Sequence, residues 1–365
     1  MNLLTLIRWL PMRVVIERSP PRATPRCARV DAKVALVVGL AAVFLAHVGL
    51  AALAERYVAV RDPVYGDLEA RLASVEAKNP PAAAQVLFLG TSRVGSGFDA
   101  QRISGGSISA FNFGVPGSGP ITHSLYLRRL LADGHRPNLL LLEVLPSSVD
   151  DRDPPPETPL LNGTRFTRPE VERLATYGVP AERLLEEWKE TDFHPFLGLR
   201  GQLLGRVMPS ALPSHRRHDE GRTGDNRGLH RIMEEAFTPE MFADGATRAR
   251  RDYTETLAKL RPGGPAARAL RDTISQARAH GISVRLVLMP EASWFRELMP
   301  PHVAARFEHW LRDLAAECGC QVLDARCWIP DSGFADGHHL LPGGAATFTD
   351  RLAAEVLTPL TEPKP

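Results

Sequence analysis

The chain of 365 residues is 44% apolar and 24% charged, which excludes collagenous, fibrous and fully disordered proteins. Its 44 basic and 42 acidic residues give a net charge of +2, too small an excess for a chain-wide nucleic-acid surface. The charge is uneven, because seven basic and two acidic residues give residues 1–33 a charge of +5 and leave −3 for the rest. We therefore expect a basic leader over residues 1–33 and no nucleic-acid partner.

Residues 34–54 form an apolar run, VALVVGLAAVFLAHVGLAALA, in which only His47 can titrate. A helix of this length rises roughly 30 Å, the thickness of the hydrocarbon core of a bilayer. The preceding basic residues predict a cytoplasmic amino terminus and an extracytoplasmic bulk. A buried core helix and a cleaved signal peptide are the alternatives, but such long core runs are rare and signal-peptide apolar regions are shorter. We expect an uncleaved single-pass anchor.

Residues 55–84 are expected to form a helical stalk, and short apolar runs alternate with helical patterns beyond it. Residues 151–159 and 209–229 are polar or proline-rich and predict loops, and Thr167-x-x-Glu170 predicts a helix start. Strands separated by helices imply an α/β fold with a parallel sheet, whose ligands bind at the carboxyl ends of the strands. The predicted strands are 86–89, 139–144, 282–289 and 321–324, and the predicted helices are 121–133, 246–260, 265–280, 302–317 and 343–357.

Four cysteines divide between the two sides of the expected membrane. Cys27 precedes the anchor, and Cys318, Cys320 and Cys327 fall in the exported part, where disulfides persist. Either Cys318 or Cys320 could pair with Cys327. A zinc site is disfavoured because the spacing is not of the paired C-x₂₋₄-C form.

A serine follows the first predicted strand in the sequence GTSRVGSG, residues 90–97. The glycine spacing resembles that of a phosphate-binding loop, but the required Lys and Ser/Thr are missing, and the dinucleotide pattern G-x-G-x-x-G is also absent. What remains is Ser92 on a tight turn at the edge of the sheet, a position suited to a nucleophile. The alternative is a serine that only forms the turn or caps a helix.

Two further segments carry candidate catalytic groups. Residues 112–120, NFGVPGSGP, predict a turn whose backbone amides, those of Gly114 and Gly117, can stabilise an oxyanion, or else a plain loop. Near the carboxyl end, Asp336 precedes His339 by three residues and can orient its imidazole for general-base chemistry. A surface histidine pair is the alternative. Adjacent histidines rarely face one ion, so we expect no metal and no cofactor.

The three segments together, FLGTSR, NFGVPGSG and DGHHL, resemble the SGNH/GDSL hydrolase superfamily. The resemblance covers roughly residues 85–150 and 282–357. It implies a three-layer α/β/α flavodoxin-like sandwich over residues 85–360, with a mainly helical insertion at about 151–280. It also implies a Ser92, His339 and Asp336 triad, with the amides of Ser92 and of Gly117 or Gly114 in the oxyanion hole.

The sequence departs from this family in two blocks. Gly-Thr-Ser replaces the usual Gly-Asp-Ser, and residues 143–148, EVLPSS, replace a Gly-x-Asn-Asp block, so that Ser147 or Ser148 would substitute for the asparagine donor. The anchored pattern is similar to bacterial SGNH-like proteins related to those of alginate acetylation and teichoic-acid D-alanylation. That likeness implies the bacterial inner membrane and an adjacent multi-spanning acyltransferase as partner.

We therefore expect a serine O-acyltransferase or esterase acting on acyl, chiefly acetyl, esters of a cell-envelope polysaccharide or an acylated small molecule. Arg93, Asn112 and Glu291 are candidate substrate-binding residues, although Arg93 could instead pair with an acid and Glu291 could begin a helix. Trp294 and Phe295 suit either a sugar platform or the core. The alternatives are a non-catalytic polymer-binding or scaffold module of a membrane acylation complex and, less favoured, a lipase or thioesterase.

Overall fold

The computed structural model describes residues 31–78, 83–212, 225–230 and 237–357. The predictions for residues 1–30, with Cys27, and for most of the loop 209–229 therefore lie outside the described residues. The chain divides into two units, Met1–Ala46 and His47–Pro365, and the larger unit contains the sheet and the candidate site.

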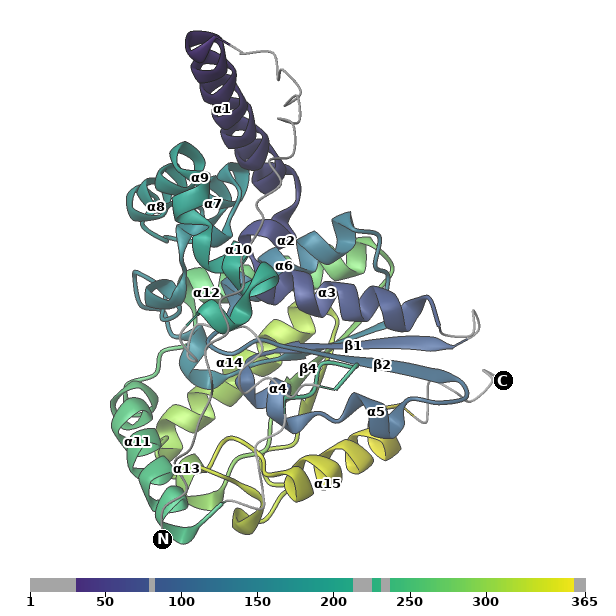
Figure 1. The fold of residues 1–365 in the computed structure, drawn as a ribbon. Coiled ribbons are helices and arrows are strands. Elements are labelled where there is room, and N and C mark those ends of the chain that lie inside the picture. Colours follow the sequence, from purple (N-terminus) through teal and green to yellow (C-terminus); the bar gives the residue numbers. More distant parts are fainter. Residues whose placement is uncertain (1–30, 79–82, 213–224, 231–236, 358–365) are drawn as a thin grey trace, which may run out of the picture. The chain divides into compact units, whose positions relative to one another are not determined.

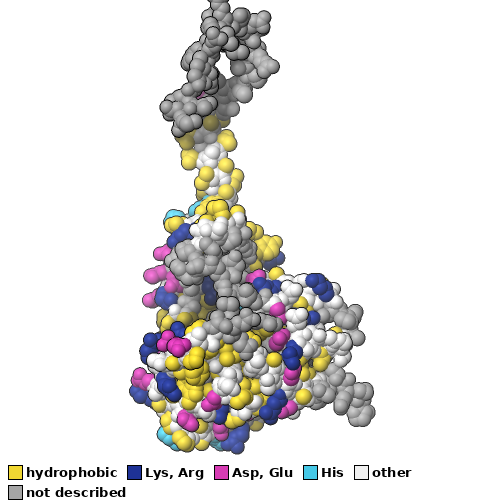
Figure 2. All heavy atoms as spheres, turned by 60° about the horizontal axis from the view of Figure 1, so that its bottom comes forward, with side chains coloured by type: hydrophobic (Ala, Val, Ile, Leu, Met, Phe, Trp, Pro, Cys, Tyr) yellow, Lys and Arg dark blue, Asp and Glu magenta, His cyan; other side chains and the backbone are white. Residues whose placement is uncertain are grey.

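Helix α1, Ala32–Arg56, contains the predicted membrane-spanning run. Its most apolar stretch has a mean hydropathy of 2.4. The large apolar side chains from Val34 to Val48 are exposed and form a yellow column in Figure 2. The helix is thus long and apolar enough to cross a membrane.

Five parallel strands form the sheet in the order β2-β1-β3-β4-β5. The chain leaves β1 toward β2 and then crosses back to β3, so the strand order reverses between β1 and β3. In open parallel sheets, ligands bind at the carboxyl ends of the strands beside such a reversal. The predicted α/β class with a parallel sheet is confirmed. The strands are β1 Ala84–Gly90, β2 Ile108–Gly114, β3 Leu139–Glu143, β4 Ser283–Leu288 and β5 Gln321–Asp324.

Helices cover both faces of the sheet (Figure 1). Because the steps from β2 to β5 all run in one direction, right-handed crossovers put α6, Pro120–Ala132, α12, Gly264–Ala279, and α14, Pro301–Cys318, on one face. The other face carries α4, Ser92–Gly97, α5, Ala100–Ile103, and α15, Pro342–Leu352. The predicted insertion at about 151–280 includes α12, but this helix is the crossover between β3 and β4.

The strand β2 was missing from our predictions, which treated residues 112–120 as a glycine loop. Its segment ISAFNFG interrupts the apolar residues with Ser109 and Asn112, so it lacks the continuous apolar run of the other strands. Both polar side chains are nevertheless buried. The Asn112 amide donates hydrogen bonds to the carbonyls of Val94 (2.8 Å) and Phe98 (2.7 Å), which satisfies it inside the fold.

The predicted stalk is helical, but it belongs to the core rather than standing apart from it. Helix α2, Val58–Arg61, leads into α3, Pro63–Glu76, whose Tyr65, Leu68, Leu72 and Val75 are buried in the main apolar cluster. A buried ion cluster fixes the start of α3. The Asp62 carboxylate lies 2.9 Å from the guanidinium groups of both Arg129 and Arg165 and accepts a hydrogen bond from Tyr126 (2.7 Å).

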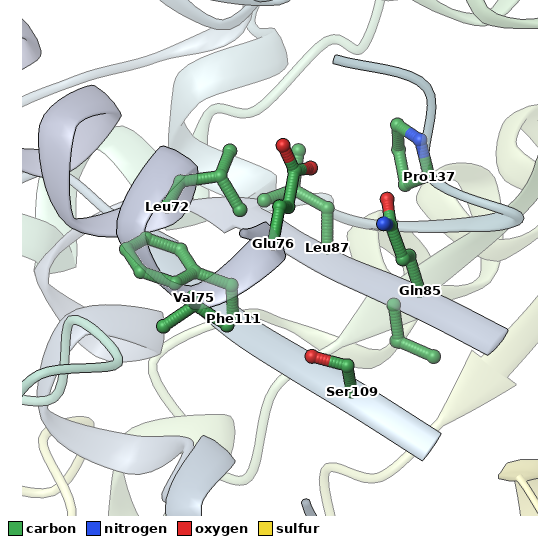
Figure 3. Close-up of a pocket in the computed structure, with 9 residues that line it drawn as sticks. Leu72, Val75, Glu76, Gln85, Leu87, Ser109, Phe111 and Pro137 are labelled. Atoms are coloured by element: carbon green, nitrogen blue, oxygen red, sulfur yellow. The ribbon is translucent and has the colours of Figure 1, made fainter. Parts of the chain in front are cut away.

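A small cavity lies between α3 and the amino-terminal parts of β1 and β2 (Figure 3). Leu72, Val75 and Phe111 form its apolar wall. Its volume is about 10 Å³, room for about one water molecule, so it cannot hold a substrate.

The described residues between β3 and α12 form five α-helices, of which α7 begins at the predicted capping box of Thr167 and Glu170. Figure 1 shows α7–α10 grouped away from the sheet. The helices are α7 Arg168–Ala175, α8 Ala181–Phe193, α9 Pro195–Gly198, α10 Arg200–Val207 and α11 Pro239–Ala258.

The cysteines of the larger unit, Cys318, Cys320 and Cys327, all carry free thiols. The pairing of Cys318 or Cys320 with Cys327, which the sequence left open, is not formed, and β5 lies between the partners. Four extended residues separate the ends of a strand by roughly 13 Å, beyond the reach of one disulfide.

Candidate active site

The carboxyl end of β1 positions Ser92 at the reversal of the sheet order. Gly90 ends the strand where a Cβ would lie 2.3 Å from Val94 and 2.6 Å from the Glu143 carboxylate, so only glycine permits this packing. The Thr91 amide donates to that carboxylate at 2.6 Å. Ser92 then begins α4, and its hydroxyl is held at the edge of the sheet by these buried neighbours.

Ser92, His339 and Asp336 form one hydrogen-bonded chain. The Ser92 Oγ lies 2.7 Å from His339 Nε2, and His339 Nδ1 lies 2.8 Å from Asp336 Oδ2. The other carboxylate oxygen of Asp336 accepts the backbone amide of His339 at 2.9 Å. Sequence segments almost 250 residues apart thus meet in the order nucleophile, base and orienting acid.

The surroundings keep Asp336 ionised. Burial raises the pKa of a carboxyl group, but the hydrogen bonds and the electrostatic interaction with His339 outweigh it, so the pKa of Asp336 lies well below its usual range. Burial, with the neighbouring His339, lowers the pKa of His338 to about 3, so that imidazole is neutral near pH 7. An ionised Asp336 fixes the His339 tautomer whose Nε2 faces Ser92 as an acceptor.

Asp336, His338 and His339 also offer possible metal-ligand atoms within 4.8 Å of one another. Both ring nitrogens of His339, however, are engaged by Ser92 and Asp336. The geometry therefore favours the hydrogen-bonded chain over a shared ion.

A cavity of about 300 Å³ opens beside Ser92. Gly117 lines it with φ near +73°, a conformation that favours glycine, and Ser147 lines it from the short helix Pro146–Val149 after β3. Within the described residues, the N–H groups of Ser92 and Gly117 have no hydrogen-bond acceptor. These two amides and the Ser147 side chain are available for an oxyanion, whereas the Gly114 amide donates to Asn112 Oδ1 at 2.9 Å and is not.

The three predicted substrate-binding residues are buried and bonded to other protein groups, and of the three only Arg93 lines the cavity. The Arg93 guanidinium is buried, donates to the carbonyls of Met289 and Pro290 at 3.0 Å, and lies 3.2 Å from Glu291 and 3.6 Å from Glu143. Glu291 is itself buried against Arg93, and its pKa is raised by that burial. The side-chain amide of Asn112 donates its hydrogen bonds to backbone carbonyls. Asn112 and Glu291 are therefore engaged within the fold and do not line the cavity, whereas Arg93 lines it and pairs with acids. That these residues contact substrate stays a prediction.

The insertion contributes residues to the cavity that our sequence analysis missed. Asp252, Tyr253 and Thr256 of α11 line it together with Ser92. The Tyr253 ring also packs at 5.0 Å from His338, and Phe295 stacks on that histidine at 4.9 Å, which places Phe295 in the core rather than on a sugar platform. No local pattern in α11 indicates this, because the contact depends on how a distant helix folds back.

Glu157, from the proline-rich loop, is a second missed cavity residue. Its Oε1 accepts the amides of Ile121 (2.6 Å) and Thr122 (3.2 Å) at the start of α6, and Gly119 leaves room for the carboxyl group. Its Oε2 is buried with no partner among the described residues. Burial outweighs the backbone hydrogen bonds and raises the pKa of Glu157 to about 7.

Glu157→Gln is expected to flatten the dependence of stability on pH. Because the folded pKa lies above the unfolded value near ~4.3, the carboxyl group stabilises the fold most at low pH, and this contribution is lost as the pH rises to about 7. Between pH 5 and 8 the wild type should lose roughly 3 kcal/mol relative to the variant, measured by urea unfolding in detergent. The control Asp252→Asn, at an exposed cavity residue, should leave the slope unchanged. Equal slopes for wild type and Glu157→Gln would contradict the expectation.

Comparison with known proteins does not identify a function for this site. No protein-family model matches the chain, and no curated protein matches it. A solved structure described as "a putative platelet activating factor from Streptococcus pneumonia" aligns over 88% of this chain and 98% of its own, with 12% identity and a TM-score of 0.33. A similarity at this level supports neither a fold assignment nor a function.

Proposed function

We propose that the chain is a membrane-anchored serine esterase or O-acyltransferase of the SGNH type. The proposal rests on the hydrogen-bonded chain from Ser92 through His339 to Asp336, whose Ser92 lines a cavity. The strand order β2-β1-β3-β4-β5, which flavodoxin-like sheets share, supports the family assignment.

The chemistry follows from the hydrogen-bonded chain. Ser92 Oγ attacks the carbonyl carbon of an ester while its proton moves to His339 Nε2, and Asp336 stabilises the resulting imidazolium. The carbonyl oxygen becomes an oxyanion that can accept hydrogen bonds from the amides of Ser92 and Gly117. His339 then gives its proton to the departing alkoxide, and the ester bond breaks to leave an acyl group on Ser92.

Water or a sugar hydroxyl completes the reaction. His339 takes the proton of the incoming hydroxyl as its oxygen attacks the acyl carbon, and Ser92 leaves with its proton restored. The cavity of about 300 Å³ is lined by both polar and apolar residues, as a site for a short acyl group on a carbohydrate would be. We propose acetyl esters of a cell-envelope polysaccharide as the substrate class.

We also propose that α1 crosses the bacterial inner membrane with its basic leader in the cytoplasm and the larger unit outside. This location puts the cavity on the side where cell-envelope polymers lie. A multi-spanning acyltransferase that exports acyl groups is the partner this arrangement suits.

One observation favours a second candidate, a non-catalytic polymer-binding module. The chain has Ser147 and Ser148 where SGNH hydrolases carry an asparagine donor, and the Ser148 hydroxyl is already donated to the Leu145 carbonyl at 2.8 Å. Only Ser147 then remains in this segment to replace the asparagine. Losing one oxyanion donor costs about 10²–10³ in rate, which slows a triad without disabling it.

Labelling by a fluorophosphonate separates the two candidates. The full chain in detergent should take up one probe, and peptide mass spectrometry should find it on Ser92. Ser148, which lines the same cavity, is the internal control and should stay unlabelled. The same preparation should hydrolyse p-nitrophenyl acetate faster than heat-unfolded protein. A chain that shows neither labelling nor hydrolysis is a binding module.

A further inference from the structure

A group of apolar side chains on α8–α10 is exposed without an evident reason. Phe193, Phe196, Leu197, Val207 and Met208, here called the apolar tip, are each at least half exposed. Exposed apolar area costs roughly 25 cal/mol per Å², and contiguous exposed patches mark interaction surfaces. The tip lies within 16 residues and on three consecutive helices.

Two residues of the apolar tip, Phe193 and Phe196, contact the helix that contains the apolar run. His47 of α1 belongs to the same unit as the tip. Its Nε2 lies 2.6 Å from the Phe193 carbonyl oxygen, and its ring is 6.2 Å from that of Phe196. The polar imidazole thus has its partner in the tip itself. Since His47 lies inside the run 34–54, the depth of His47 sets the depth of Phe193 and Phe196, the tip residues that contact it.

The length of the run places His47 within the bilayer. Lys33 marks the inner limit of the apolar run. Residues 34–46 rise only roughly 20 Å, against the ~30 Å needed to cross the hydrocarbon core. A spanning helix must therefore continue beyond His47 to about Ala54, which puts His47 roughly 10 Å inside the outer boundary. Residues that touch His47 lie at the level of the outer lipid leaflet.

The amino-acid composition of residues 193–208 is typical of a segment that contacts lipid. Residues 193–208, FHPFLGLRGQLLGRVM, contain two arginines and no acidic residue. Apolar side chains beside basic ones, without acids, are typical of helices that lie in a membrane interface with anionic phosphates. A bilayer also covers separately exposed side chains without the matched groove that a protein partner needs.

We propose that the apolar tip inserts into the outer leaflet of the membrane that α1 crosses. This inference rests on the proposed membrane anchoring and extends it. The larger unit is then attached at two places, by the end of α1 and by the α8–α10 segment. Such a double attachment restricts tilting of the unit and keeps it against the membrane surface.

Photo-crosslinking to lipid tests the proposal in the full chain, reconstituted in nanodiscs of phosphatidylethanolamine and phosphatidylglycerol. The photoreactive residue p-benzoylphenylalanine replaces Phe196 or Val207 in the tip, Val43 in the run, or Met241 on α11. Met241 is the matched control, because it is an exposed apolar residue of a helix outside the tip. Mass spectrometry then counts lipid adducts after irradiation. We expect adducts at 196 and 207 within a few-fold of those at 43 and at least about ten-fold above those at 241.

The outcomes distinguish the tip from the anchor. Lipid adducts at position 43, with only the control level of adducts at positions 196 and 207, overturn the insertion of the apolar tip. The proposed membrane anchor is then unaffected. Absence of adducts at 43 overturns the anchor, and the tip proposal with it. Irradiation in native membranes adds a third outcome. A protein adduct of defined mass at 196, in place of lipid, assigns the tip to a protein partner and overturns insertion into lipid.

Discussion

Asp336→Asn is expected to lower the rate of p-nitrophenyl acetate hydrolysis by about 10⁴-fold while the chain stays folded. An asparagine amide beside His339 Nδ1 can present N–H in place of an accepting oxygen. The imidazole then takes the other tautomer, with a proton on Nε2, and cannot accept the proton of Ser92. The loss also removes the negative charge that stabilises the imidazolium in the transition state. Stopped-flow and steady-state kinetics on the full chain measure the effect.

Two further variants give the lowest and the highest rate with which the Asp336→Asn variant is compared. Ser92→Ala removes the attacking oxygen and sets the background rate. Asp331→Asn removes a carboxylate of the same segment that binds the Ser293 amide (2.7 Å), outside the triad, and should change the rate by less than about three-fold. An Asp336→Asn variant that kept more than a tenth of wild-type activity would show that His339 does not depend on this carboxylate. The triad mechanism would then be wrong.

Arg93→Met is expected to destabilise the fold by roughly 3–5 kcal/mol. The guanidinium offsets the charges of Glu143 and Glu291, both buried, and binds two carbonyls at the end of β4. Methionine fills similar space but leaves these carboxylates without a cation. Unfolding in urea, followed by circular dichroism in detergent, should show the loss as a shift in midpoint.

A double variant tests whether Arg93→Met destabilises the fold through uncompensated buried charge or through loss of packing. Adding Glu291→Gln to Arg93→Met removes one uncompensated charge and should recover part of the stability. Arg152→Met is the matched control, since Arg152 also lines the cavity but is half exposed and pairs with Asp150 at 2.6 Å. Because Arg152 is half exposed, water can solvate Asp150 in its place, and we expect a smaller loss of stability than for Arg93→Met. A double variant no more stable than Arg93→Met would rule out buried charge as the cause.

The sequence predicted the catalytic candidates better than their surroundings. Ser92, His339 and Asp336 carry local signals, a serine after a buried strand and an Asp-x-x-His turn, and the structure brings them together. Arg93 and Asn112 flank the same motifs, yet the sequence does not reveal whether such side chains point into a cavity or beneath it. Glu157 and Tyr253 reach the cavity through long-range packing of the insertion, which leaves no periodic trace in the sequence.

In the membrane-anchored arrangement proposed above, the buried ion cluster at Asp62 bears on how the larger unit could be released by proteolysis. Proteolytic shedding of anchored domains usually needs a single cut in an exposed linker. Here Asp62, with Arg129, Arg165 and Tyr126, locks the start of α3 to the body of the fold. A single cut between α3 and β1 would sever the backbone but leave α3 docked by these contacts and by its buried apolar face. In that proposed arrangement, the nicked protein would stay attached to α1 as a non-covalent complex.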